Sequence, residues 1–234
     1  MQSNKVRQIL SQNVWFASLP DPLANKLLEK GKFKVLLDQQ ILHQKNDSAD
    51  GFHCVVSGRV RISNFTVEGK ELVLTWIQPG NWFGEISLID DQPRTHDAHA
   101  EGTTTLLKVP KSAFKQIFID HQDWSQHIMR LLCQRVRATF SLIDETGCLS
   151  LKGQLCKRLS LMQQGLEEQQ GLEELQSKSM ELTISQDSLA QLIHSSRQTV
   201  NKILQSLQTD KVIALRYGKI IILNRVALEA LGQI

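Results

Sequence analysis

A short segment in the first half of the chain carries residue types that suit a phosphate and a sugar. Gly84 is followed directly by Glu85, and Arg94 and Thr95 come ten and eleven residues after the glycine. A glycine lets the backbone approach a ligand closely, and a planar guanidinium matches the geometry of phosphate oxygens. The carboxylate of Glu85 could accept hydrogen bonds from sugar hydroxyls. This spacing inside a β-rich region predicts a pocket for a phosphate-bearing ligand.

The residues between this glycine and arginine add backbone donors. The sequence Ile86-Ser87-Leu88-Ile89 is expected to form one helical turn. The first N–H groups of a helix have no partner within the helix and suit an anion. The backbone of Ile86 and Ser87 therefore joins the predicted pocket.

A second informative group lies near the end of the chain. Its members are polar or basic and suit the edges and phosphates of DNA: Ser196, Arg197, Gln198, Thr199, Asn201 and Lys202. On a helix, Arg197 shares one surface line with Asn201, and Gln198 shares the adjacent line with Lys202. Arginine reads guanine in the major groove, glutamine or asparagine reads adenine, and lysine reads guanine or binds phosphate. The two hydroxyl residues of the group can donate to phosphates at the helix N-terminus.

The elements around this group form a helix-turn-helix pattern. Apolar positions at helical spacing define two short helices: Leu189, Ala190, Ile193, Val200, Ile203 and Leu204. Three residues, His194-Ser195-Ser196, separate the helices, and His194 is expected to take the left-handed backbone that such a turn needs. Two apolar runs that flank Tyr217-Gly218 predict a β-hairpin, which would be the wing.

The charge distribution supports a polyanion partner for the same segment. The net charge of the 234 residues is only +3, but residues 194–225 hold six basic residues against the single acid Asp210. A concentrated basic stretch in a nearly neutral protein favours nucleic acid as the partner.

The region from residue 34 to residue 110 has the period of β-strands. Val60 and Ile62 alternate with polar residues, and turn signals such as Ser57-Gly58 and Pro79-Gly80 recur at short intervals. Many short strands at close spacing predict an antiparallel sandwich or barrel. Short amphipathic helices are expected within the first forty residues.

A long helix is expected from Asp123 to about Thr146. It lacks Gly and Pro over this length and carries a narrow stripe at 3-4 spacing, made of Met129, Leu132, Val136, Thr139, Ile143 and Thr146. A stripe this narrow favours pairing with the same helix of a second copy. After a further helix that begins at Leu151, an acidic six-residue repeat occupies residues 163–174.

Several classes of protein are excluded. The longest apolar runs are far too short for a membrane span, and the first residues lack the apolar core of a signal peptide, so the expected compartment is the cytoplasm. The four cysteines have no metal-site spacing and are expected to be free thiols. No metal site and no catalytic constellation is expected.

Taken together, these motifs resemble the Crp/Fnr superfamily of transcriptional regulators over nearly the whole chain. The resemblance rests on residues 55–61, 79–85 and 196–202 and on the long helix. It implies an α+β fold with three parts. These are a β-roll sensor of the cyclic-nucleotide-binding type (a double-stranded β-helix, or jelly roll) at 1–122, a dimerisation helix at 123–147, and a winged helix-turn-helix domain at 148–234. The implied partners are palindromic promoter DNA, a second copy of the chain and RNA polymerase.

The resemblance also assigns roles within the pocket. In cyclic AMP binders of the family, the residue matching Glu85 holds the ribose, and those matching Arg94 and Thr95 hold the phosphate. The helix pair that recognises adenine in those proteins is expected here at Leu142 and Ile143, with Ala138 in place of an arginine one turn earlier. The residues expected to hold the phosphate and the ribose therefore match the family pattern, whereas those expected to recognise adenine do not. Cyclic AMP and cyclic GMP are thus both candidate effectors.

Two other interpretations of the sensor remain open. β-Rolls also hold metal sites, but His96 and His99 lie on opposite faces of a strand, and His53 is isolated from them in sequence. A metal-dependent enzyme or a metal sensor is therefore disfavoured. In the other interpretation, the chain is a regulator of the same family with a vestigial pocket or a non-nucleotide signal.

Overall fold

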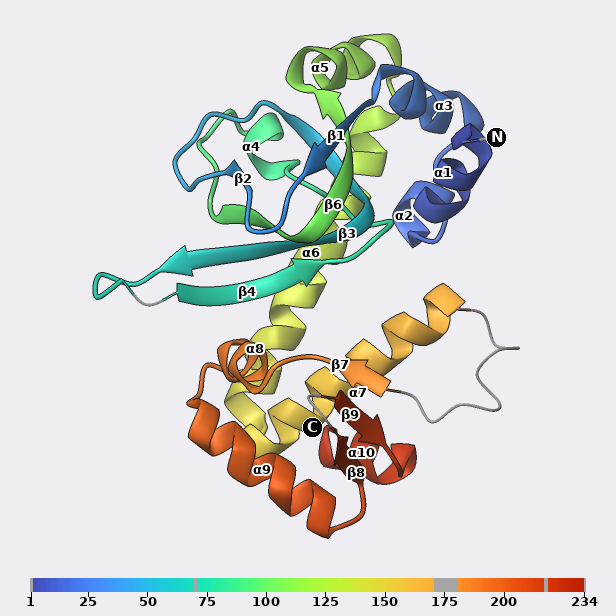
Figure 1. Cartoon of the computed structure of the whole chain (residues 1–234). Helices are drawn as coiled ribbons and strands as arrows, with labels where there is room; N and C mark the ends of the chain where they lie inside the picture. Colours follow the sequence, from blue (N-terminus) through green and yellow to red (C-terminus); the bar gives the residue numbers. More distant parts are fainter. Residues whose placement is uncertain (1, 70, 171–180, 217–218, 234) are drawn as a thin grey trace. The chain divides into compact units, whose positions relative to one another are not determined.

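The computed structural model describes residues 2–69, 71–170, 181–216 and 219–233 (Figure 1). The chain divides into two compact units, Met1–Arg135 and Val136–Ile234. This division falls inside one long helix, α6 (Trp124–Cys148). The domain limits expected at residues 122 and 147 stay predictions. No helix in the described ranges combines the length and the apolar character that crossing a bilayer requires.

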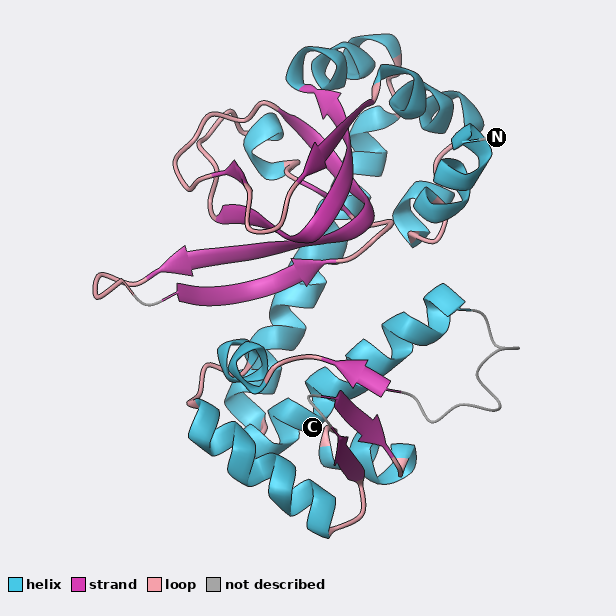
Figure 2. Cartoon of the chain, in the orientation of Figure 1, coloured by secondary structure: helices cyan, strands magenta, loops and turns pink. Residues whose placement is uncertain are grey.

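The first unit is built on an antiparallel sheet that continues through two long, curved strands, as Figure 2 shows. The strand order is β1-β6-β3-β4, with β2 paired to β6 and β5 paired to β3. The strands are β1 (Lys32–Leu36), β2 (Ile41–His43), β3 (Gly51–Phe65), β4 (Glu71–Ile77), β5 (Trp82–Phe83) and β6 (Asp97–Pro110). The expected β-rich sensor region is therefore confirmed.

Strand β3 runs through a place where the sequence indicated a turn. Ser57-Gly58 lies within β3, where the register against β6 shifts. Gly58 has φ +76°, and a Cβ there would lie 2.6 Å from the carbonyl oxygen of Thr103. Only glycine fits this bulge, which bends the strand without ending it.

Side chains of β3 alternate between two cores. Phe52 and Cys54 face an outer core shared with the helices of the unit. Val55 and Val60 face an inner core with Phe83 from β5. Because strand side chains alternate, His53 lies on the inner side with Val55.

The outer core holds three tryptophans. Trp15, Trp82 and Trp124 are fully buried, and the rings of Trp15 and Trp82 pack edge to face at 5.9 Å. The Trp15 indole N–H donates to the carbonyl of His127 at 2.7 Å, which fixes the start of α6 to the N-terminal helices. The other helices here are α1 (Gln2–Leu10), α2 (Val14–Ala17), α3 (Asp21–Lys30) and α5 (Lys111–Asp120).

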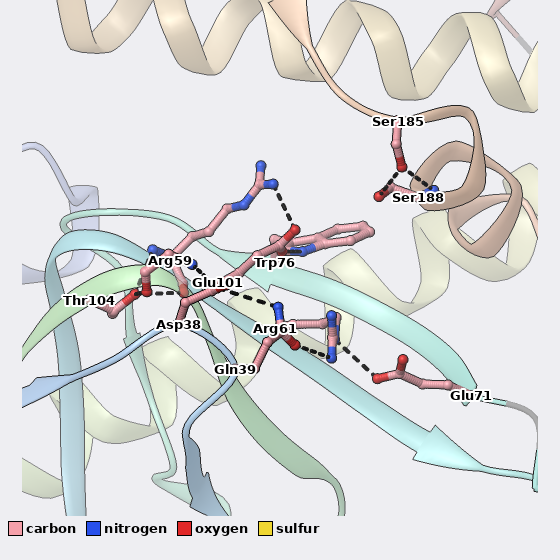
Figure 3. A network of polar contacts seen from close by, with 11 residues as sticks. Asp38, Gln39, Arg59, Arg61, Glu71, Trp76, Glu101, Thr104, Ser185 and Ser188 are labelled. Carbon is pink, nitrogen blue, oxygen red and sulfur yellow. Dashed lines mark hydrogen bonds and ion pairs between the residues drawn. The ribbon is translucent and has the colours of Figure 1, made fainter. Parts of the chain in front are cut away.

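Polar contacts cross the outer faces of strands β3, β4 and β6 (Figure 3). Arg59 pairs with Glu101 at 2.9 Å, and Trp76 donates its indole N–H to the same carboxylate. Arg61 pairs with Glu71 at 3.0 Å. The two ion pairs connect adjacent strands, and the bond from Trp76 on β4 to Glu101 on β6 spans β3, so these contacts support the register of the sheet.

The second unit is a small α/β domain with the expected helix-turn-helix and hairpin. Its helices after α6 are α7 (Leu151–Gln170), α8 (Gln186–Leu192), α9 (Arg197–Thr209) and α10 (Arg225–Leu231). Its strands are β7 (Glu181–Thr183), β8 (Ile213–Arg216) and β9 (Lys219–Ile222), in the antiparallel order β7-β9-β8. The first copy of the acidic repeat, residues 163–168, continues α7, whereas residues 171–174 lie outside the described part.

The apolar stripe on α6 differs from the expected one. Leu132 packs against the outer core of the first unit and leaves the surface stripe. The exposed residues at 4-3-4-3 spacing are Met129, Cys133, Val136, Phe140 and Ile143. Met129, Val136 and Ile143 belong to both stripes, whereas Cys133 and Phe140 take the places predicted for Leu132 and Thr139, because Leu132 is needed in the core of the first unit.

Candidate functional sites

Arg94 is buried and is held from several sides. Its guanidinium is 3% exposed and donates to the carbonyl oxygens of Gly84 and Gly51, both at 2.9 Å. It also pairs with the Asp50 carboxylate at 3.1 Å. Burial lowers the pKa of Arg94, and Asp50 opposes this effect. The arginine and glycine of the sequence motif are therefore in direct contact, as the motif requires.

Gly84 makes this contact by its backbone conformation. Its φ is +91°, and a Cβ there would lie 2.6 Å from Nη1 of Arg94. A side chain at this position would force the guanidinium away from the carbonyl it now reaches.

Glu85 is buried beside the start of helix α4 (Ile86–Ile89), at 2% exposure. Its Oε1 lies 3.4 Å from Nε of Arg135 on α6, and Arg135 also donates to the carbonyl of Trp82. The turn of α4 is present as expected, and Ser87 uses its hydroxyl to donate to the carbonyl of Pro93 at 3.0 Å.

Two buried polar atoms of the motif lack a hydrogen-bond partner and suit the ligand that the sequence predicts. Within the described residues, Oε2 of Glu85 and Nε of Arg94 have no hydrogen-bond partner. Leaving such groups unsatisfied costs about 1–3 kcal/mol each. These are an acceptor suited to a hydroxyl and a donor suited to a phosphate oxygen, so the residues present fit that half of a cyclic nucleotide. Thr95 is exposed, and its hydroxyl bonds to Nδ1 of His96 at 2.9 Å.

Two histidines beside Arg94 were not part of the predicted site. His53 is fully buried, stacks on Phe83 with ring centroids 5.4 Å apart, and lies 3.8 Å from Asp50. Burial lowers the pKa of His53 to about 3 and that of His43 to about 4, so both rings are neutral near pH 7. Burial raises the pKa of Asp50, but the hydrogen bonds from Lys108 and Arg94 outweigh it and hold this pKa at about 2.

Arg135 is the residue of α6 that sequence analysis missed. The expected arginine position was 138, where the chain has alanine, yet Arg135 is the arginine beside Glu85. If Arg135 is the arginine of the family pattern, the match along α6 shifts by three residues. Thr139 and Phe140 then take the positions that were assigned to Leu142 and Ile143. A shift of three residues keeps a similar helix face, so periodicity alone does not reveal it. The roles of Leu142 and Ile143 stay predictions, and Leu142 lines a hollow of about 410 Å³ within the second unit.

The helix-turn-helix of the second unit has the local geometry expected from its sequence. Ser185 caps α8 by accepting from the backbone N–H of Ser188 at 3.0 Å (Figure 3), and Ser196 caps α9 through Thr199 at 3.1 Å. His194 has φ +48° in the turn, as predicted.

The predicted reading residues of α9 differ in exposure. Arg197, Gln198 and Lys202 are exposed, whereas Asn201 is half-buried. Arg197 pairs with Asp187 of α8 at 3.2 Å, and Asn201 accepts from the Gln186 amide at 3.4 Å. The contribution of each residue to DNA binding stays a prediction.

Two family models match the chain, one in each half. The cyclic nucleotide-binding domain matches residues 33–121, and the Crp-like helix-turn-helix domain matches residues 153–231. The chain belongs to the Crp/Fnr superfamily of transcriptional regulators. Like its family, this Crp/Fnr chain is a regulator and not an enzyme.

Individual relatives of this Crp/Fnr regulator are distant. It is 28% identical over 162 residues to a CRP-like cAMP-activated global transcriptional regulator of Mycobacterium tuberculosis, covering 68% of this chain and 70% of the relative. Its fold is similar to FixK2 of Bradyrhizobium japonicum, with a TM-score of 0.73 at 16% identity over 87% of this chain and 98% of the other. It is also similar to the c-di-GMP responsive regulator CLP of Xanthomonas campestris, with a TM-score of 0.71 at 20% identity over 87% and 99% of the chains.

Proposed function

We propose that this Crp/Fnr regulator is a homodimer that binds palindromic promoter DNA under the control of a cyclic nucleotide in the β-roll. The observation that carries the ligand proposal is the pair of unsatisfied buried atoms, Oε2 of Glu85 and Nε of Arg94. The proposed ligand site includes Glu85, Arg94, Thr95 and the backbone of residues 84–87, with Leu142 and Ile143 as predicted helix contacts. A cytoplasmic location and a contact with RNA polymerase accompany this role.

DNA binding is proposed for the exposed side of α9. Arg197, Gln198 and Lys202 are exposed at its N-terminal half, and the positive end of the helix dipole adds to their charge. Ser196 and Thr199 would contact phosphates, and Asn201 would contribute from its half-buried position. Strands β8 and β9 would form the wing.

Dimerisation is proposed through α6. Val136, Phe140 and Ile143 are 50%, 61% and 58% exposed in the single chain. Together with Met129 and Cys133 they have the a/d spacing of a coiled coil, which is stable only when a second helix covers it. A symmetric pair would place two copies of α9 about 34 Å apart on one face of DNA.

Two relatives support different cyclic nucleotides as the effector. The Mycobacterium relative is described as cAMP-activated and the Xanthomonas protein as c-di-GMP responsive. The residues that match the family pattern would hold phosphate and sugar, and these ligands share both groups. The test must therefore include cyclic AMP, cyclic GMP and cyclic dinucleotides.

Calorimetry and thermal unfolding with each of these ligands test the proposal. A ligand that binds only the folded state raises the free energy of unfolding by about 2.7 kcal/mol at a concentration of 100 Kd. Arg94→Leu should abolish the binding heat. Thr209→Ala, an exposed hydroxyl substitution at the end of α9, is the matched control and should leave it unchanged.

A second candidate function follows from Asp50. Its carboxylate pairs with Arg94 and Lys108, and in this way it already neutralises the arginine. In this alternative the pocket is vestigial and Asp50 takes the place of the phosphate. The absence of heat and of stabilisation at millimolar concentrations of every cyclic nucleotide would favour the alternative.

A further inference from the structure

Helices α8 and α9 are neighbours in the second unit (Figure 1). The first turn of α8 contacts two of the predicted reading residues on α9. Asp187 accepts from Nη1 of Arg197 at 3.2 Å. Gln186 donates to Oδ1 of Asn201 at 3.4 Å. Arg197 and Asn201 are one helical turn apart, so two successive residues of α8 contact two successive positions on the same line of α9.

Asp187 places a negative charge beside the predicted reading residues of α9. Asp187 is the one acidic residue between residues 185 and 209, a segment that also holds Arg197 and Lys202. A carboxylate close to phosphates weakens DNA binding by repulsion. Helix capping does not require it, because Ser185 already caps α8. A first-turn acid also stabilises its helix through the dipole, and the experiment must separate that effect.

The geometry of the pair leaves Arg197 able to read a base. The contact with Asp187 uses Nη1, so the edge formed by Nε and Nη2 can still present two parallel N–H groups. Two such donors match O6 and N7 of guanine in the major groove. The side chains of Arg197 and Asp187 are 66% and 61% exposed, so this ion pair restrains an arginine that lies largely in solvent.

We propose that Asp187 is a specificity-determining positioning residue that presents Arg197 to a guanine and disfavours its use on phosphate. An arginine oriented before binding loses less side-chain entropy when it meets the base. The negative charge beside it lowers the affinity for DNA of any sequence. Asp187 would therefore increase discrimination between sequences at the expense of total affinity. This inference rests on the proposed sequence-specific binding by α9.

The experiment uses the full chain and a DNA site that it selects itself. The unmodified protein is used to enrich a palindromic site from random-sequence duplexes, with and without cyclic AMP. The position that Arg197 reads is the one at which Arg197→Ala loses its base preference. Affinities are then measured for the selected site, for sites with that base pair replaced, and for an unrelated duplex over a range of salt concentrations.

Asp187→Asn should lower discrimination and raise non-specific affinity. An exposed ion pair contributes modestly, so the base preference at this position should fall about 2- to 30-fold over the two half-sites. Binding to the unrelated duplex should tighten at low salt. Asp187→Glu should restore part of the preference. Asp210→Asn removes the same charge at the opposite end of α9, where the carboxylate pairs with Lys152 at 3.0 Å, and should leave the preference unchanged.

A double-mutant cycle separates positioning from helix stability. The cycle compares the ratio of the affinity for the selected site to the affinity for the unrelated duplex, which Arg197→Ala lowers but need not abolish. If Asp187 acts through Arg197, Asp187→Asn should not lower this ratio further in the Arg197→Ala background. Unchanged base preference in Asp187→Asn, or an equal loss of this ratio in both backgrounds, would overturn the inference. Failure of the unmodified protein to enrich any sequence would instead overturn the proposed function.

Discussion

At the scale of single residues, the surroundings of His53 predict a pH dependence of stability. The pKa of His53 is lowered to about 3 and that of His43 to about 4, because burial disfavours their charged forms. In the unfolded chain both rings titrate near pH 6.5, so the unfolded state binds more protons in the range between these values. The native state is therefore fully stable above about pH 6.5 and loses stability as the pH falls through 6 and 5.

We expect His53→Phe to reduce this pH dependence. Phenylalanine keeps the stacking partner for Phe83 and carries no proton-binding group. Between pH 6.5 and pH 5, His53 should account for a loss on the order of 1–2 kcal/mol in the free energy of unfolding. Urea unfolding at a series of pH values measures the difference. His121→Phe, at the C-cap of α5, is the control. If the free energy of unfolding changed equally with pH in His53→Phe and in the unmodified chain, His53 would not be the source of the pH dependence.

The first residues of α9 predict separate effects on specificity and on affinity. Gln198 is exposed and lies where base edges would be read, whereas Thr199 bonds to the cap residue Ser196 at 2.9 Å and lies where phosphates would be contacted. Gln198→Ala should cost about 1–3 kcal/mol on a selected site and relax one base position. Thr199→Ala should weaken binding to all sequences alike. Fluorescence anisotropy with a panel of single-position site variants distinguishes the two, and identical patterns would be inconsistent with this assignment of roles.

At the scale of elements, sequence periodicity predicted the strands, the helix-turn-helix and the hairpin. It did so because alternation and 3-4 spacing report directly which side of each element is buried. Strand β7 was missed because it has only three residues, of which Leu182 alone is buried. The contacts to Glu85 and Arg94 were partly missed for a different reason. Arg135 and Asp50 are distant from the motif in sequence, and only the tertiary structure brings them together.

The exposed stripe on α6 predicts a dimer that a single substitution should weaken. Phe140→Asp would place two unpaired carboxylates in the seam, which disfavours pairing while leaving the single chain intact. Gln134→Asp, an exposed position outside the stripe, should leave the dimer unchanged. Light scattering at micromolar concentration measures the mass in each case. A monomer in the unmodified protein would remove the basis for this prediction.

Cys133 provides a reporter for the direction of pairing. In a parallel pair, equal positions of the seam lie opposite each other. In a Cys148→Ser background, a short thiol-specific crosslinker should join two chains through Cys133, since Cys54 and Cys156 are buried. The crosslink should disappear in the Cys133→Ser, Cys148→Ser double variant. A crosslink that persists there would come from another thiol, and no crosslink in the Cys148→Ser background would contradict a parallel pairing through Cys133.

At the scale of the whole molecule, the proposed function requires that the pocket and the DNA surface influence each other. Each is built almost entirely within its own unit, and α6 is the element that continues from one unit into the other. A ligand at Glu85 would also meet Arg135, which bonds to Glu85 from α6. Any preference of the ligand for one arrangement of this helix would reach the second unit.

This coupling has a quantitative consequence that can be tested without knowing the structural route. If a cyclic nucleotide raises the affinity for the selected DNA site by a given factor, the DNA must raise the affinity for that nucleotide by the same factor. We expect a factor of about 5 to 150, which is typical of allosteric proteins. Calorimetric titration of the nucleotide with and without saturating DNA gives one factor, and DNA titration with and without nucleotide gives the other. In Arg135→Leu, which removes the contact from α6 to Glu85, both factors should move together toward one. Nucleotide binding that leaves DNA affinity unchanged in the unmodified protein would exclude control of DNA binding by the pocket, because a ligand with equal affinity for both states shifts neither.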